Sequence, residues 1–124
     1  MPDVPKLVGK DITLELGPPT APEDDPIILK CPWTVEVNHD FAALLTIGRD
    51  EAEQQFYYRV PEDRARDLQE VLYASVASHN ITEDGQPVKG DPRTVLLQRL
   101  SPEELLLLRR QFAQKALRLR DQGN

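Results

Sequence analysis

One cysteine and two histidines are the side chains of this sequence best suited to catalysis or metal binding. A cysteine nucleophile needs a histidine base that is held by a third group, and a metal site needs several His, Cys or carboxylate ligands at workable spacing. Cys31 lies between Lys30 and Pro32, while His39 and His79 fall in different predicted elements. We therefore expect a plain buried or edge thiol and no metal site, although an enzyme built on Cys31 stays an open alternative.

Other catalytic signatures are missing from the sequence. The six glycines never cluster, so there is neither a phosphate-binding loop nor a dinucleotide fingerprint. The acid pairs Glu51/Glu53 and Glu62/Asp63 lie in charged stretches, whereas carboxylate catalysis usually needs a desolvated acid. We predict that the protein is not an enzyme and binds no cofactor.

Length and composition are those of one globular domain covering residues 1–124. The chain has 124 residues, of which 40% are hydrophobic and 29% charged. No apolar run approaches the ~18–20 residues of a membrane span, and the N-terminus lacks the layout of a signal peptide. A single cysteine excludes an internal disulfide. These features predict a cytoplasmic protein with no membrane contact.

The net negative charge of the chain lies entirely in its first half. Residues 1–60 contain five Lys or Arg and eleven Asp or Glu, which gives −6, whereas residues 61–124 contain ten of each. Nearly all non-specific affinity for nucleic acid comes from neutralised phosphates. An acidic domain is therefore a poor general nucleic-acid binder, and we disfavour nucleic acid as a partner.

Residues 1–60 are predicted to be β-rich, because their apolar positions alternate or form short runs bounded by turn residues. The last part of this half is ambiguous, since Asp50 with Glu53 suits the cap of a short helix, but we favour a hairpin because Phe, Tyr and Val prefer strands. The predicted strands are 10–16, 27–29, 33–37, 43–47 and 55–60.

A proline-rich, acidic segment separates the first two predicted strands. Residues 17–26 contain four prolines and an acidic run, with no helix or strand pattern. Such a segment is either a solvated loop or an arm that becomes ordered on a partner. The candidate partner-binding residues in it are Pro18, Pro19, Glu23, Asp24 and Asp25.

Residues 61–120 are predicted to be helical, with helices over about 61–79, 91–100 and 101–120. The last helix has the clearest start, because Ser101 suits the N-cap, Pro102 the first position and Glu104 the capping box. Two apolar seams on it predict either two neighbours within the domain or one neighbour and one partner. Its opposite face is the second candidate contact and carries Leu107, Arg110, Gln114 and Arg118.

Cations are concentrated in the second half of this last helix, where no acid occurs between residues 109 and 120. They complement the negative end of the helix dipole, and they also suit docking on an acidic partner or a phosphate backbone. Strands in the first half and helices in the second predict the α+β class, with an antiparallel sheet of four to five short strands and two to three helices packed on it.

Three features occur together in residues 61–120: Ser78-His79-Asn80-Ile81 at a helix end, the turn Glu83-Asp84-Gly85-Gln86-Pro87, and the Leu-rich helix that begins at Ser101. In these features residues 61–120 resemble the small accessory proteins of tailed bacteriophages, particularly tail assembly chaperones. The resemblance implies a non-enzymatic role in assembling a virion or within the particle, in the host cytoplasm or the virion.

The main functional hypothesis is therefore a binding protein that works in a hetero- or homo-oligomeric assembly of protein chains. The alternative is an acidic regulator or inhibitor that occupies a basic surface, such as the nucleic-acid site of a host enzyme. Acidic charge would steer its encounter, so that its association should slow steeply with added salt.

Overall fold

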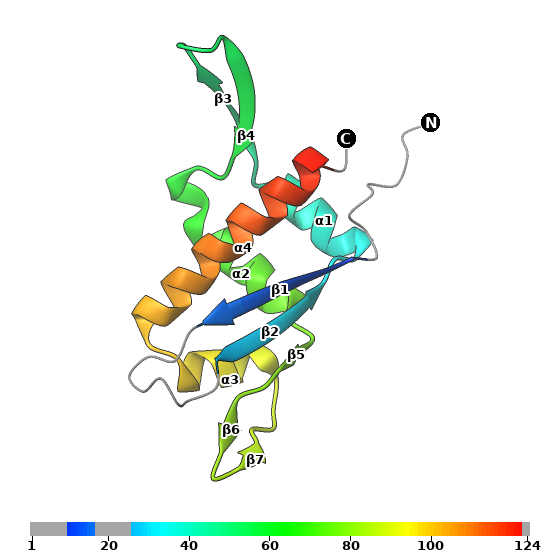
Figure 1. The fold of residues 1–124 in the computed structure, drawn as a ribbon, viewed down its shortest axis with the longest axis vertical. Helices are drawn as coiled ribbons and strands as arrows, with labels where there is room; N and C mark the ends of the chain where they lie inside the picture. Colours follow the sequence, from blue (N-terminus) through cyan, green and yellow to red (C-terminus); the bar gives the residue numbers. More distant parts are fainter. Residues whose placement is uncertain (1–9, 17–25, 123–124) are drawn as a thin grey trace.

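The computed structural model describes residues 10–16 and 26–122. The α+β class is confirmed, with helices packed on an antiparallel sheet (Figure 1). The strands are β1 (Asp11–Leu16), β2 (Ile27–Pro32), β3 (Thr46–Asp50), β4 (Gln55–Arg59), β5 (Ser78–His79), β6 (Thr82–Glu83) and β7 (Gln86–Pro87). The helices are α1 (Val35–Ala42), the short η1 (Glu62–Arg64), α2 (Ala65–Ser75), α3 (Pro92–Arg99) and α4 (Pro102–Gln122).

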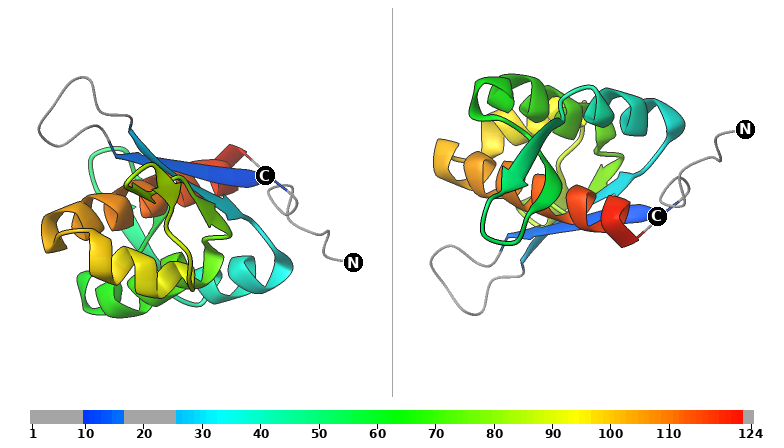
Figure 2. Two further views of the ribbon diagram at one scale, coloured as in Figure 1. Left: turned by 90° about the horizontal axis from the view of Figure 1, so that it is seen from below. Right: turned by 90° about the horizontal axis from the view of Figure 1, so that it is seen from above.

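The main sheet has the antiparallel strand order β1-β2-β5. Along β1 every second side chain is buried, as its polar–apolar alternation predicts. The register sets Ile12 opposite Cys31 and Leu14 opposite Leu29, so four buried side chains cover one face of this ladder. Figure 2 shows the sheet on one side of the molecule and α2 and α3 on the other.

Helix α4 covers the outer edge of β1. Gln111 accepts the N–H of Glu15 at 2.7 Å and donates to its carbonyl at 2.9 Å, and Lys115 donates to the carbonyl of Thr13. Gln111 and Lys115 are four helical residues apart, a rise of about 6 Å. Thr13 and Glu15 are two strand residues apart, a rise of about 6.6 Å, so the spacing of the donors on α4 matches that of their partners on β1. The side chains of α4 therefore satisfy backbone N–H and C=O groups at the edge of β1 that could otherwise pair with another strand.

Three aromatic side chains join the sheet end, α1 and α4. Trp33, Phe41 and Phe112 lie with ring centroids 5.5 to 6.0 Å apart, and each is at most 1% exposed. The indole N–H of Trp33 donates to Asn38 at 3.1 Å, which satisfies the one polar atom of the indole ring. Residues from both halves of the chain thus share one hydrophobic cluster.

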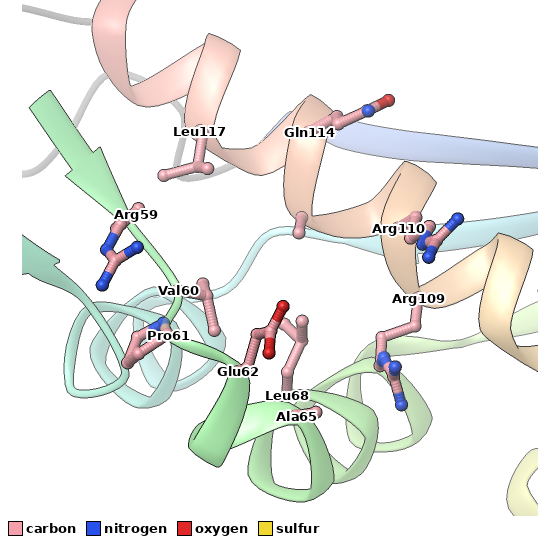
Figure 3. A pocket seen from close by; sticks show the side chains of 11 residues that line it. Arg59, Val60, Pro61, Glu62, Ala65, Leu68, Arg109, Arg110, Gln114 and Leu117 are labelled. Carbon is pink, nitrogen blue, oxygen red and sulfur yellow. The ribbon is translucent and has the colours of Figure 1, made fainter. Parts of the chain in front are cut away.

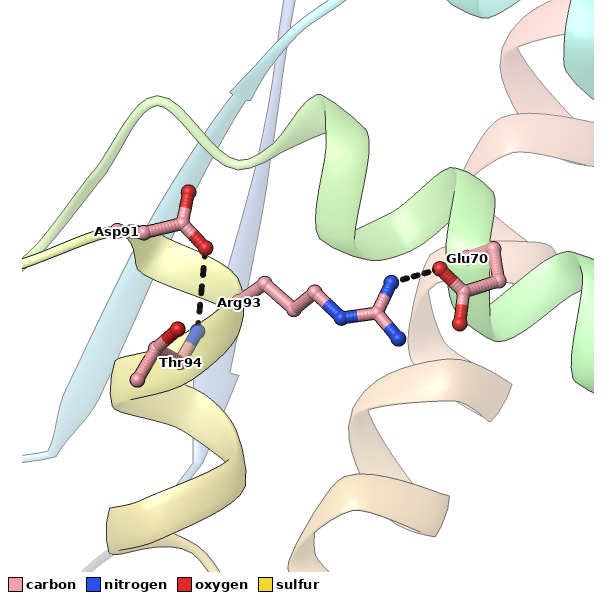
Figure 4. Close-up of polar contacts among 4 residues, drawn as sticks. All are labelled: Glu70, Asp91, Arg93 and Thr94. Carbon is pink, nitrogen blue, oxygen red and sulfur yellow. Dashed lines mark hydrogen bonds and ion pairs between the residues drawn. The ribbon is translucent and has the colours of Figure 1, made fainter.

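Helix starts follow the cap signals of the sequence. Ser101 and Glu104 form the predicted capping box, with N–H···O distances of 2.9 and 3.2 Å. At α3 the carboxylate of Asp91 accepts the N–H of Thr94, and the next residue after Pro92, Arg93, reaches back to Glu70 on α2 (Figure 4). The predictions of α3 and α4 are confirmed.

The strand predicted over residues 33–37 is wrong, because α1 begins there. Thr34 is the N-cap, and its hydroxyl accepts the N–H of Val37 at 3.1 Å. The alternation of Trp33, Val35 and Val37 suggested a strand, but Val35 is 65% exposed. The buried residues Trp33, Val37 and Phe41 recur every four positions, which is the helical spacing.

Three further expectations need correction. The strands do not share one sheet: β3–β4 and β6–β7 are separate two-stranded hairpins. The helix predicted to residue 79 ends at Ser75, because the N–H of Ala77 already pairs with the carbonyl of Lys30 on β2. The strand predicted over residues 43–47 begins too early, because Ala43 is the C-cap of α1 and β3 starts at Thr46. The turn predicted over residues 83–87 agrees with the structure, where it joins β6 to β7 and where Asp84 and Gly85 have the positive φ of an Asp-Gly turn.

Candidate interaction surface

The hairpin β3–β4 projects from the body of the molecule (Figure 1). Its strands pair over five positions from Thr46↔Arg59 to Asp50↔Gln55, and they pack extensively only on each other. Every residue of β4 is exposed. Of the seven exposed large hydrophobic side chains in the described residues, four lie on this hairpin: Ile47, Phe56, Tyr57 and Tyr58.

One face of the hairpin is apolar and exposed; we call it the apolar hairpin face. The register pairs Ile47 with Tyr58 and Arg49 with Phe56, and directly opposed residues of antiparallel strands share a face. Ile47 is 62% exposed, Phe56 71% and Tyr58 50%. The guanidinium of Arg49 lies 5.8 Å from the centre of the Phe56 ring, so it covers only this ring.

The other face is occupied by its own tyrosine. Tyr57 lies opposite Gly48, and a Cβ added at Gly48 would fall 2.5 Å from the Cζ atom of the Tyr57 ring. The ring therefore packs over the glycine backbone, which is how aromatic side chains compensate for glycine in a strand. This packing stabilises the hairpin itself, whereas on the apolar hairpin face the contact of Arg49 with Phe56 leaves Phe56 71% exposed.

The tip of the hairpin is acidic. The carboxylate of Asp50 accepts the N–H groups of Ala52 and Glu53, and the positive φ of Gln54 completes the reversal. Asp50 and Glu53 were considered as the cap of a short helix. In the structure the carboxylate of Asp50 instead caps this turn. Residues 50–55 contain three acids and no base, so the projecting end of the hairpin carries concentrated negative charge.

A groove of about 610 Å³ lies at the base of the hairpin, between the end of β4, the start of α2 and the middle of α4 (Figure 3). Its apolar lining includes Val60, Leu68, Ala113 and Leu117. One of the two apolar seams predicted on α4 consists of Leu106, Ala113 and Leu117. The residues of this seam are only partly buried within the protein, and the last two of them line the groove.

Three arginines surround the groove. Arg59 lies at one end beside Leu117, and Arg109 and Arg110 lie at the other, with Glu62 between them (Figure 3). Arg109 donates to the amide of Gln69, and within the described residues no carboxylate lies within ion-pair distance of any of the three. The groove therefore combines an apolar floor with guanidinium groups that can still bind carboxylates.

The predicted contact residues have different outcomes. Leu107, Arg110, Gln114 and Arg118 are all exposed on α4, Leu107 by 54%, and two of them, Arg110 and Gln114, also line the groove. The other candidates lie outside the described residues: Pro18, Pro19, Glu23, Asp24 and Asp25.

The apolar hairpin face was not among the sequence candidates. Phe56 and Tyr58 stood in a predicted strand, and strand residues of this type are ordinarily core. One signal in the sequence could have indicated this face. The two short strands are joined by an acidic turn, so no apolar element next to them in the sequence is available to cover the hairpin. Only the spatial arrangement shows that nothing among the described residues covers Ile47, Phe56 and Tyr58.

Cys31 lies in the core with none of its surface exposed. Burial raises the pKa of its thiol to about 11, although a hydrogen bond with Ser75 acts in the opposite direction. A nucleophilic cysteine needs access and a lowered pKa, so the geometry argues against catalysis at this thiol. Within the described residues no three His, Cys, Asp or Glu side chains form a group that could hold a metal.

Among the helices in the described ranges, none combines the length and apolar composition of a membrane span. Comparison with family models, with curated proteins and with solved structures finds no match for this chain.

Proposed function

We propose that this protein is a non-enzymatic interaction component of a larger protein assembly, and that the β3–β4 hairpin is its principal contact with another protein chain. The observation that carries the proposal is the apolar hairpin face, where Ile47, Phe56 and Tyr58 are each at least half exposed. Interface centres are enriched in aromatic residues and arginine, and this face consists of two aromatics, one arginine and one isoleucine.

The energetics of the hairpin support the same proposal. A two-stranded hairpin without a covering layer is marginally stable in water, and burial of its apolar face against a partner would stabilise it. The body of the protein does not need this face, because its own core is filled by the aromatic cluster and the sheet. An exposed apolar surface that folding does not use suggests binding.

The resemblance of residues 61–120 to tail assembly chaperones supports a phage tail or virion as the assembly. On this proposal the protein acts in the host cytoplasm or in the particle, with other protein chains as partners and without nucleic acid or membrane. The Leu107 face of α4 then serves as a second, smaller contact, because Leu107 is 54% exposed between polar residues.

Native mass spectrometry at gentle salt, on tagged protein recovered from its natural source, tests the proposal. Wild-type protein should appear in a complex with fixed ratios of chains. A variant with Phe56→Ala and Tyr58→Ala should lose that complex, while its melting temperature stays close to that of the wild type. A bare monomer from the wild type, or a complex that the hairpin variant retains, contradicts the proposal.

Two further variants show whether any loss is specific. Leu97→Ala removes an apolar side chain of α3 that is 49% exposed, similar to Tyr58, and should leave the complex intact. Leu107→Ala examines the α4 face separately and should weaken the complex less than the hairpin variant does.

A further inference from the structure

The groove at the base of the hairpin selects for an occupant that is both acidic and apolar. Its rim carries Arg59, Arg109 and Arg110 against the single acid Glu62, and its floor is apolar. Guanidinium groups pair with carboxylates in a bidentate geometry. A segment with carboxylates beside small or apolar side chains therefore matches both properties of the groove.

The tip of the β3–β4 hairpin has this chemistry. Residues 50–55 carry Asp50, Glu51 and Glu53 around Ala52, and the apolar hairpin face begins immediately behind the tip with Phe56. The tip projects from the molecule, and β3 and β4 pack extensively only on each other. Charge and apolar character therefore match between two surfaces of the same chain.

A hairpin cannot fill the groove of its own molecule. Arg59, the last residue of β4, and Val60, which follows it, belong to the groove, so the groove lies at the base of the hairpin. The strands extend about 17 Å from that base, at ~3.4 Å for each of five residues, and the tip points away from the body. The hairpin tip can therefore reach a groove of this kind only on a second copy.

We propose that the acidic tip of the β3–β4 hairpin of one copy docks between the arginines of the groove of a second copy. This rests on the proposed function, since it names the partner of the hairpin. In this arrangement the carboxylates of Glu51 and Glu53 of one copy pair with Arg110 and the other two groove arginines of the second copy. Phe56 of the first copy then lies against the apolar floor of that groove. Because each copy carries both surfaces, two copies can exchange hairpins reciprocally.

Site-directed disulfide formation gives a direct test, with the full chain and its buried Cys31 left in place. A tagged Ala52→Cys chain is mixed with an untagged Gln114→Cys chain under mild oxidation. The matched control replaces the second chain by Gln98→Cys, an exposed glutamine on α3. We expect at least tenfold more tagged–untagged cross-link with Gln114→Cys, and equal yields from the two mixtures overturn the proposal.

A charge exchange measured by sedimentation equilibrium tests the same contact without new cysteines. Arg110→Glu, and separately Glu51→Arg with Glu53→Arg, should each weaken self-association at least tenfold, and the combination in one chain should recover most of the loss. Asp50 is left intact because its carboxylate holds the turn. Arg66→Glu, a change at an exposed residue of α2 that is not part of the groove lining, should leave association unchanged.

The outcomes separate this inference from the proposed function. If the wild type is monomeric at every concentration, the second copy is excluded, whereas loss of a native complex from the Phe56/Tyr58 variant still upholds the hairpin as a contact. If Arg110→Glu abolishes that complex while the Glu51/Glu53 change does not, the groove holds an acidic segment of a different protein and the inference is wrong.

Discussion

Two of the antiparallel sheets in the described residues, β1-β2-β5 and β3–β4, differ in what packs against them. In the β1-β2-β5 sheet, one face is buried and the outer edge of β1 is covered by Gln111 and Lys115 of α4. In the β3–β4 hairpin, nothing among the described residues covers the apolar hairpin face. Both ladders have apolar side chains, so the difference lies in what packs against them. The first ladder supplies stability, and the second is available for contact.

The strongest test of this contrast is Phe112→Ala. Phe112 is fully buried against Trp33 and Phe41, where it joins α4 to the rest of the core. Removal of a buried Phe side chain typically costs about 3–5 kcal/mol. We expect a loss of this size in urea denaturation followed by circular dichroism. A loss below about 1 kcal/mol would mean that the aromatic cluster does not support the fold as described.

The buried thiol gives a second test, in the form of a pH dependence. Burial holds the pKa of Cys31 at about 11 in the folded chain, above its ordinary value of 9.0. The folded state therefore keeps the proton more tightly than the unfolded state. Stability is complete below about pH 9 and falls as the pH rises toward 11, by an amount on the order of 2 kcal/mol.

The measurement compares wild type with Cys31→Ala from pH 8 to pH 11. All other side chains are common to the two proteins, so the difference between the two curves isolates the thiol. Wild-type protein should lose more stability over this range than Cys31→Ala. Parallel curves would show that folding does not raise the pKa of the thiol, and fast modification by a disulfide reagent at neutral pH would show that Cys31 is accessible.

Gln111→Ala addresses the covered edge of the main sheet. The amide of Gln111 makes two hydrogen bonds to the backbone of Glu15 near the surface, where water can replace them in part. We expect a loss of about 1 kcal/mol in the free energy of unfolding and faster hydrogen exchange at the N–H of Glu15. Gln114→Ala, one turn further along α4, is the control and should stay within about 0.5 kcal/mol of wild type.

Local signals in the sequence predicted much of the fold. The alternation of β1 and the caps at Asp91 and Ser101 each depend on residues close together in the chain, and each agrees with the structure. The prediction failed where the apolar residues fitted both the two-residue repeat of a strand and the repeat of about four residues of a helix. Residues 33–37 alternate like a strand, but the hydroxyl of Thr34 and the four-residue spacing of Trp33, Val37 and Phe41 fix a helix.

The candidate surface was less predictable, for a physical reason. Exposure of Phe56 and Tyr58 depends on the absence of any covering element, and this is a property of the whole arrangement in space. The groove likewise joins Arg59 to Arg109 and Arg110, which lie 50 residues apart in the sequence. The exposed face of α4 could be predicted, because one helix determines which of its side chains share a side.

The smallest expected effect on stability, and the sharpest comparison, comes from Phe56→Ala. It removes the same side chain as Phe112→Ala, but from a position that is 71% exposed and contacts Arg49 across the hairpin. The free energy of unfolding should change by no more than about 0.5 kcal/mol, because loss of this contact loosens the hairpin locally without opening the core. The same variant should weaken self-association at least tenfold in sedimentation equilibrium. A stability loss comparable to that of Phe112→Ala would make the hairpin part of the core and remove the basis for treating its apolar face as a binding surface.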